Sequence, residues 1–218
     1  AAATDNGDAG LVTHSEYLGM FYPSGFTTDN IGKNIVVPAS HMMLRTLINS
    51  DAKSYPWFAP AGVRRGGVDN VTSVGYITDE GEFKSTALPQ GLRDVLDDVK
   101  INPIATLTGV GVLAYGQRTR AKNASALDRI NVARLVVYLR VQLERIAKPY
   151  IFEPNDSLTF GDIKGEINES VKKYLPKLKI KTITVEESNE SEYTSIVRID
   201  YIVTDDVFET QDFIILEL

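Results

Sequence analysis

Apolar residues recur at helical spacing in four segments of the chain, and this pattern predicts four helices. Two are short, from about Ala39 to Asn49 and within residues 88–102. Two are long, from about Ser125 to Lys148 and within residues 157–180. The apolar positions that define them are, in chain order, Met43, Leu47 and Ile48; Leu92, Val95, Leu96 and Val99; Ile130, Leu135, Leu139, Leu143 and Ile146; and Ile163, Ile167, Val171 and Leu175.

Capping residues and prolines predict where these helices begin and end. Ser125 can cap the third helix, and Asp128 three residues later supports its first turn. Because a proline inside a helix removes a hydrogen bond and clashes with the preceding turn, we expect Pro103 to close the second helix and Pro149 the third. Pro176 is expected to end or kink the fourth.

Short apolar or aromatic runs between turn residues predict the strands. They cover, in chain order, residues 16–25, 34–38, 71–78, 104–108, 111–116, 181–186, 193–203 and 212–218. The polar stretch 186–192 is typical of a hairpin connection. Because strands and helices do not alternate regularly, we expect an α+β fold, a mainly antiparallel sheet packed with two long and two short helices.

The segment YPWFAPAGVRRGG, Tyr55 to Gly67, fits neither pattern. Its thirteen residues include two prolines, three glycines and three aromatics, so it is too irregular for a helix and too broken for a central strand. Local chemistry leaves open a binding loop, a catalytic loop or a rigid structural corner. Trp57, between Pro56 and Phe58, favours a plug in the core over a platform on which bases stack.

Composition limits the class of protein. The 218 residues suffice for one large domain or two small ones, and a hydrophobic share of 43% provides a sizeable core. Cysteine is absent, which excludes disulfides, thiolate metal sites and cysteine nucleophiles. No apolar run is long enough for a membrane span. The first residues resemble neither a signal peptide nor an initiator start, so we expect the cut edge of a longer protein or the mark of a processed one.

Charge is unevenly distributed around a net charge of −6. Residues 117–150 hold eight Lys/Arg against two Asp/Glu, whereas residues 187–218 hold one Arg against nine Asp/Glu. This asymmetry fits a nucleic-acid surface, complementary ends for self-association, or simply a solvated helix face and a solvated strand edge. An overall acidic chain, without aromatics interleaved among the arginines from Arg118 to Lys148, argues against nucleic acid.

The sequence matches no common catalytic or ligand-binding motif. His14 and His41 lack the spacing of a metal site, and the glycines of residues 108–116 lack the lysine of a phosphate loop and the full dinucleotide pattern. Asp97–Asp98 and Asp205–Asp206 are adjacent pairs whose side chains diverge. We therefore expect no catalytic residue, no cofactor and no metal, and a protein that works by packing. The remote alternatives are a hydrolase with an unrecognised carboxylate site and a nucleic-acid-binding module that uses the stretch from Arg118 to Lys148.

Four motifs in order resemble the contractile-tail sheath proteins of phages. They are a proline-containing strand end at Val37–Ser40, a Trp-x-x-Pro-Ala-Gly corner at Trp57–Gly62, Asp-Arg-Ile-Asn-Val at Asp128–Val132, and Phe-Glu-x-Asn at Phe152–Asn155. The resemblance covers roughly residues 16–218 and is weak across 68–105. One departure is Ala133, where the family usually carries arginine, so a contact made through that position is in doubt.

The resemblance implies a structural role without enzymatic activity. Sheath subunits stack as hexameric rings around a tail tube, and a trigger at the baseplate makes the sheath contract and drive the tube through the host envelope. It implies, as partners, other sheath subunits, the tail tube protein, and baseplate and tail terminator proteins, but no nucleic acid and no membrane. The expected location is the contractile tail of the virion, and the host cytoplasm during assembly. A sheath from a contractile bacteriocin or secretion apparatus is the main alternative.

The resemblance also assigns parts of the chain. Residues 1–204 are expected to form the inner sheath domain of a longer protein, and residues 205–218 a linker and a strand donated to a neighbouring subunit. The expected roles fall into three sets: a stiff structural corner at Pro56, Trp57, Phe58, Pro60, Ala61 and Gly62; a subunit or tube interface at Arg134, Arg140, Arg145 and Lys148; and an exchanged strand at Phe213, Ile214, Ile215 and Leu216.

Overall fold

The computed structural model describes residues 14–69, 71–154, 156–174, 178–188, 191–203 and 209–217, and beyond residue 170 it describes the backbone alone. The chain divides into two compact units, Ala1–Leu135 and Val136–Leu218. Helices and mainly antiparallel strands are mixed along the chain, which confirms the predicted α+β class. The strands form three small sheets rather than a single sheet.

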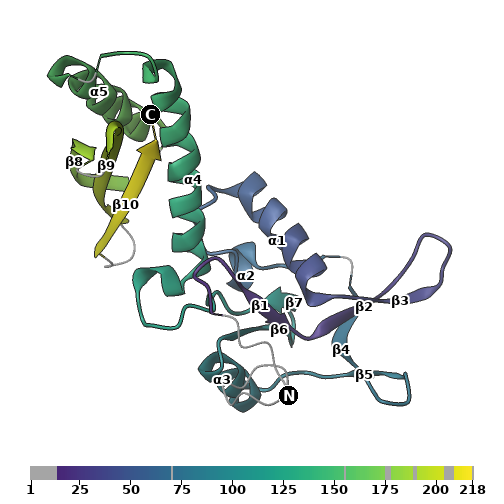
Figure 1. Ribbon diagram of the computed structural model, residues 1–218. Coiled ribbons are helices and arrows are strands. Elements are labelled where there is room, and N and C mark those ends of the chain that lie inside the picture. The colour runs from purple at the N-terminus through teal and green to yellow at the C-terminus, as the bar shows by residue number, and fades with distance from the viewer. Residues whose placement is uncertain are drawn as a thin grey trace. The chain divides into compact units, whose positions relative to one another are not determined.

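A four-stranded antiparallel sheet lies in the first unit. Its order is β3 (Asn34–Val37), β2 (Ser24–Thr28), β4 (Ser73–Ile77) and β5 (Phe83–Ser85), as Figure 1 shows. β3 and β4 fall within predicted segments, whereas β2 begins at the end of the predicted segment 16–25, where a turn was expected, and continues three residues beyond it. The sequence did not predict β5, which is only three residues long.

A three-stranded sheet completes the first unit, in the order β1 (Met20–Tyr22), β6 (Ile101–Leu107) and β7 (Gly111–Ala114). The pairing of β1 with β6 is parallel and that of β6 with β7 is antiparallel. The prediction that Pro103 closes a helix is wrong, because Pro103 lies inside β6. The helix ends earlier, and Lys100, three residues before Pro103, has a φ of 55° that is incompatible with a continuing helix.

Three helices belong to the first unit, α1 (Ala39–Lys53), α2 (Gly62–Arg65) and α3 (Gln90–Asp98). The first is longer than predicted, and α2 is a single turn within the segment that the sequence left open. The buried positions of α1 are Ala39, Met42, Met43, Thr46 and Ser50.

This buried face of α1 corrects the predicted one. Met43 is 2% exposed as expected, but Ile48 is 60% exposed. Thr46 takes a core position because its hydroxyl donates to the Met42 carbonyl oxygen at 3.1 Å, so a buried polar side chain is satisfied by the helix backbone.

The core of the first unit joins α1 to both sheets. Buried residues of one cluster are Ala39, Met42, Val68, Val74 and Ile104, and Phe21, Val37, Val71 and Val112 pack against them. Val74 and Ile104 are completely buried, one from each sheet.

The long helix α4 spans Ile130–Ala147. The predicted start at Ser125 is wrong: residues Ala126–Asp128 form a separate 3-10 turn, and Ser125 makes no side-chain capping bond. Arg129 is extended, at φ −112° and ψ 131°, and separates the two.

The second unit carries the 3-10 turn η2 (Lys148–Tyr150) and α5 (Ser157–Tyr174), followed by an antiparallel sheet of β8 (Leu178–Ser188), β9 (Ser191–Val203) and β10 (Glu209–Glu217). β9 is the central strand (Figure 1). All three predicted strands and the β8–β9 hairpin are therefore present.

The second unit buries one side of each long helix. The buried apolar residues are Val136, Leu139, Leu143 and Ala147 of α4 and Ile163 and Ile167 of α5. Leu139, Leu143, Ile163 and Ile167 were predicted from their spacing. The predicted positions Val171 and Leu175, and the predicted boundary between residues 204 and 205, lie outside the described side chains and residues. Within the described part of the chain, no helix combines the length and apolar character needed to cross a membrane.

Candidate assembly surface

The segment Tyr55–Gly67, whose structure the sequence pattern did not predict, contains a stack of aromatic rings. Trp57 is 4% exposed, and its ring stacks on Tyr55 with centroids 4.7 Å apart and planes 9° from parallel. The Phe58 ring also stacks on Tyr55, with centroids 6.1 Å apart, and the Arg65 guanidinium lies 4.8 Å from the Phe58 ring centroid. Buried area and cation–π attraction together hold these side chains in one arrangement.

Backbone contacts fix this segment to the rest of the unit. Arg65 Nε donates to the Ala59 carbonyl oxygen at 3.0 Å, and Ala114 N donates to the Gly66 carbonyl oxygen at 2.8 Å. Gly62 begins α2 at a φ of +76°, and a Cβ at Gly66 would lie 2.6 Å from the Ala114 oxygen. Both positions therefore require glycine, and the segment has the geometry of the predicted structural corner.

A buried asparagine that the sequence reading missed links three backbone segments. Asn102, 1% exposed, donates through Nδ2 to the carbonyl oxygens of Met20 at 2.9 Å and Arg118 at 2.8 Å. Its Oδ1 accepts from Arg118 N at 2.5 Å. This side chain replaces main-chain pairing where β1, β6 and the loop after Gly116 meet. The neighbouring pair Asn102-Pro103 was the only sequence signal.

The first arginines of the basic stretch point inward. Arg118 Nε donates to Asp97 Oδ1 at 2.7 Å, and its Nη1 lies 3.7 Å from Asp128 Oδ2. The hydrogen bond to Asp97 raises the pKa of the Arg118 guanidinium above its ordinary value. Arg120 is 3% exposed and donates through Nη1 to the Val99 carbonyl oxygen at 2.7 Å. These two residues therefore stabilise the fold and do not form a phosphate-binding face.

The predicted interface residues separate into two groups. Arg134 is not partly free as predicted: its Nη2 lies 2.5 Å from Asp51 Oδ2 at the end of α1, and its side chain is 23% exposed. Arg140, Arg145 and Lys148 are exposed. Of the predicted set, these three remain accessible on the second unit.

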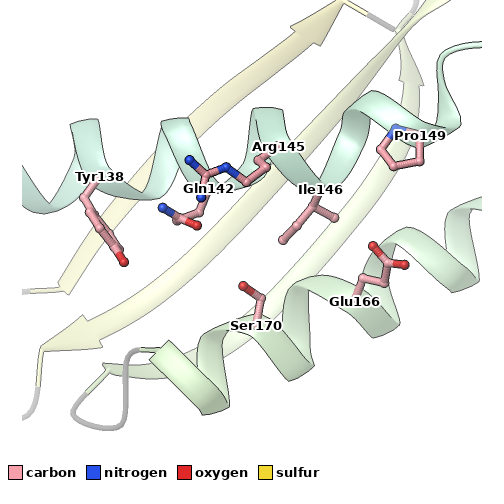
Figure 2. Close-up of a pocket in the computed structure, with 7 residues that line it drawn as sticks. All are labelled: Tyr138, Gln142, Arg145, Ile146, Pro149, Glu166 and Ser170. Carbon is pink, nitrogen blue, oxygen red and sulfur yellow. The ribbon is translucent and has the colours of Figure 1, made fainter.

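A cavity of about 360 Å³ lies between α4 and α5 within the second unit. Tyr138 and Ile146 point from α4 toward α5, while Ser170 and Glu166 point from α5 toward α4 (Figure 2). The lining residues are Tyr138, Gln142, Arg145, Ile146, Pro149, Glu166 and Ser170. The cavity therefore combines an apolar part with both signs of charge.

Hydrogen bonds hold the connection between α4 and α5 beside this cavity. Desolvation and a side-chain hydrogen bond with Glu166 raise the pKa of the Tyr150 hydroxyl. Asp156 Oδ1 accepts from the backbone amides of Leu158 at 3.1 Å and Thr159 at 2.9 Å and so caps α5. The backbone amide of Thr159 lowers the pKa of Asp156 below its usual range.

The Phe-Glu-x-Asn motif falls on this connection. Phe152 is 98% exposed, the largest exposed fraction among the large apolar residues of the described part. Asn155 lies outside the described residues. The sequence analysis used Phe152 only as part of a family motif and did not predict that its ring is exposed to solvent.

The predicted exchanged strand forms most of β10. In the single chain, β10 pairs with β9 from Glu209↔Ile202 to Glu217↔Thr194. This is the intramolecular closing strand that a donated strand would replace, so exchange with a neighbouring subunit stays a prediction.

Comparison with known proteins finds sequence similarity to phage proteins. No protein-family model matches the chain. The tail sheath protein of Vibrio phage KVP40 is 34% identical over 136 residues, which are 62% of this chain and 19% of the phage protein. The tail sheath protein of Enterobacteria phage T4 is 31% identical over 130 residues, 60% of this chain and 18% of that protein. About three fifths of the chain is therefore similar in sequence to phage tail sheath proteins.

Solved structures share the fold of this chain. A chain of the anti-feeding prophage baseplate superposes with a TM-score of 0.69 at 19% identity, covering 100% of this chain and 58% of that one. A chain of the contracted sheath complex of an extracellular contractile injection system (PVC) superposes with a TM-score of 0.65 at 18% identity, covering 94% of this chain and 56% of that one. The matched residues therefore span under a fifth of the curated phage proteins and just over half of these solved chains.

Other described residues make contacts within the fold. Within the described residues, no group of three or more His, Cys, Asp or Glu is placed to hold a metal ion. The motif Asp128–Val132 serves the fold: Asp128 pairs with Arg118 and Arg129, and Asn131 is 6% exposed. Ala133, the departure from the family pattern, is 5% exposed.

Proposed function

We propose that this chain is part of a structural subunit of a contractile tail sheath, which surrounds the tail tube and contracts to drive it through the host envelope. The observation that carries the proposal is the 34% identity with a phage tail sheath protein over 62% of the chain. A non-enzymatic role accords with that relationship and with a fold shared by sheath assemblies. Identity to phage proteins favours a phage tail over another contractile machine.

The packing of the first unit suits a subunit that moves as a rigid body. A subunit that reorients during contraction transmits force only if its core does not deform. The structural corner, the three hydrogen bonds of Asn102 and the Arg134–Asp51 ion pair each join segments distant in sequence. Partners on this proposal are neighbouring sheath subunits, the tail tube, and baseplate and terminator proteins, within the virion tail.

The accessible cations of α4 and η2 are proposed to face an acidic partner, the tail tube or an adjacent sheath subunit. Arg140, Arg145 and Lys148 are exposed, and single exposed pairs contribute only ~0–1 kcal/mol to folding. Replacing all three with alanine should leave unfolding nearly unchanged and weaken assembly, most visibly at low salt. Arg134 is excluded from this set because it already pairs with Asp51. Assembly equal to that of the parent would contradict the assignment.

β10 is proposed to exchange between subunits. Removing it leaves the edge of β9 open for a strand from a neighbour, with main-chain hydrogen bonds that persist as subunits rotate. Truncation after Thr210 should then leave a folded chain that no longer polymerises. An unfolded product, or normal polymers, would contradict exchange.

Polymer formation tests the proposed function itself. The purified chain should form rings or tubes that sediment and are visible by negative-stain electron microscopy. A chain that remains monomeric with added tail tube protein, across protein and salt concentrations, would count against a sheath role.

A further inference from the structure

The second unit carries an exposed aromatic side chain on the connection between α4 and α5, and a cavity between the same two helices. Phe152 projects with 98% of its surface exposed, beside Ile151 at 46%. The cavity between α4 and α5 has a volume of about 360 Å³. We propose that Phe152 of one copy inserts into the α4–α5 cavity of the next copy, forming a head-to-tail contact between subunits. This inference rests on the proposed sheath function.

The connection that presents Phe152 is held in place before any partner binds. Glu153 N donates to the Tyr150 carbonyl oxygen at 3.1 Å, and Asp156 N donates to the Pro154 carbonyl oxygen at 3.0 Å. The Tyr150 hydroxyl bonds Glu166 of α5, and Asp156 caps the same helix. An exposed aromatic ring on a pre-ordered loop binds without a large ordering cost.

Size and charge both fit the cavity to this ring. An apolar cavity of ~150 Å³ suffices to hold benzene, so about 360 Å³ accommodates a phenyl ring with its flanking backbone. Ile146 and Pro149 supply apolar contact, and the Arg145 guanidinium supplies a cation for the ring face. Glu153, exposed next to Phe152, brings an acidic group toward Arg145. The occupant is therefore an aromatic residue followed by a carboxylate, as in Phe152-Glu153.

The contact joins Phe152 of one copy to the cavity of another. Where the second copy places its own Phe152 in a third copy, the contact is heterologous and continues as a ring or an open helix. The same pair of surfaces thus generates the repeated assembly that a sheath requires. A second copy of this chain is the occupant to which the proposal commits.

Site-directed cross-linking tests the contact, and the cysteine-free sequence makes it specific. Chains with Phe152→Cys and chains with Ser170→Cys are mixed and oxidised with oxygen and copper phenanthroline. The proposal predicts a disulfide-linked heterodimer. The matched control pairs Ser170→Cys with Ile31→Cys, because Ile31 is 93% exposed in the other unit. Gln142→Cys provides a second cavity position in case Ser170→Cys does not fold.

A binding measurement complements the cross-link. Phe152→Ala should raise the Kd of self-association at least about tenfold, as truncation of a buried aromatic anchor does, while Ile31→Ala leaves it unchanged. Cross-linking no greater than in the control, from both cavity positions, would overturn the proposal. If tubes form but the cross-link does not, this contact is refuted and the proposed sheath function stands. If the cross-link forms but tubes do not, the contact is supported and the proposed sheath function is contradicted.

Discussion

Replacing Trp57 with alanine should remove the largest side chain of the structural corner and destabilise the chain strongly. Trp57 is 4% exposed and stacks on Tyr55 at 4.7 Å. Emptying a buried Trp site costs ~3–5 kcal/mol, which includes the cavity left behind. For a chain of this length each kcal/mol lowers Tm by roughly 2–4 °C, so the loss should be about 6–20 °C. Domains of this kind have only ~5–15 kcal/mol of stability.

Thermal and urea unfolding followed by circular dichroism measure this effect. Tyr55→Ala is the matched control, because Tyr55 is 42% exposed and its removal takes away the stacking partner but opens little cavity. It should cost about 0.5–1.5 kcal/mol, the value of an aromatic pair. Trp57 is the only tryptophan of the chain, so parent fluorescence should show a buried indole that shifts to the red on unfolding. A Trp57→Ala variant that unfolds with the parent, or a parent emission already typical of water, would refute the reasoning.

Three further changes test other contacts of the described structure. Asn102→Ala leaves three buried backbone groups without partners and should cost about 3 kcal/mol or more, with Asn102→Asp intermediate; equal urea midpoints would contradict this. Arg134→Ala and Asp51→Ala should each lower the free energy of unfolding by about 1.5–3 kcal/mol, and the two losses should not add up in a double-mutant cycle. Additive losses would exclude the ion pair. The pKa of Asp156 is lower in the folded than in the unfolded state. Its cap therefore contributes fully to the stability of the fold above the unfolded pKa of about 3.9, and this contribution is lost as pH falls through the folded-state pKa. Asp156→Asn should remove that part of the acid dependence seen by circular dichroism, and an unaltered acid profile would argue against the cap.

Helix positions were predicted well from periodicity, and helix ends were not. α4 begins at Ile130 because Arg129 is extended and Asp128 pairs with Arg118, a contact between residues ten apart that no local pattern reveals. Pro103 was assigned to a helix end because proline breaks helices. It stands in β6 because α3 had already ended before Lys100, at positive φ.

The site residues were predictable only where side-chain type decides their place. Trp57 between two prolines is buried, as its size and setting suggest. Arg134 was taken for an accessible cation because its partner, Asp51, lies on a helix far away in sequence. Asn102, in β6, and the exposed ring of Phe152 were missed for a related reason: their burial and exposure depend on tertiary packing, which the period of a helix or strand does not report.

Electron cryomicroscopy of the assembled protein with tail tube tests the central claim most directly. The account predicts rings of six copies stacked around the tube, with the exposed cations of α4 and η2 at a contact between protein chains. Particles in which the chain occurs as a monomer, or as a closed dimer away from any tube, would contradict it.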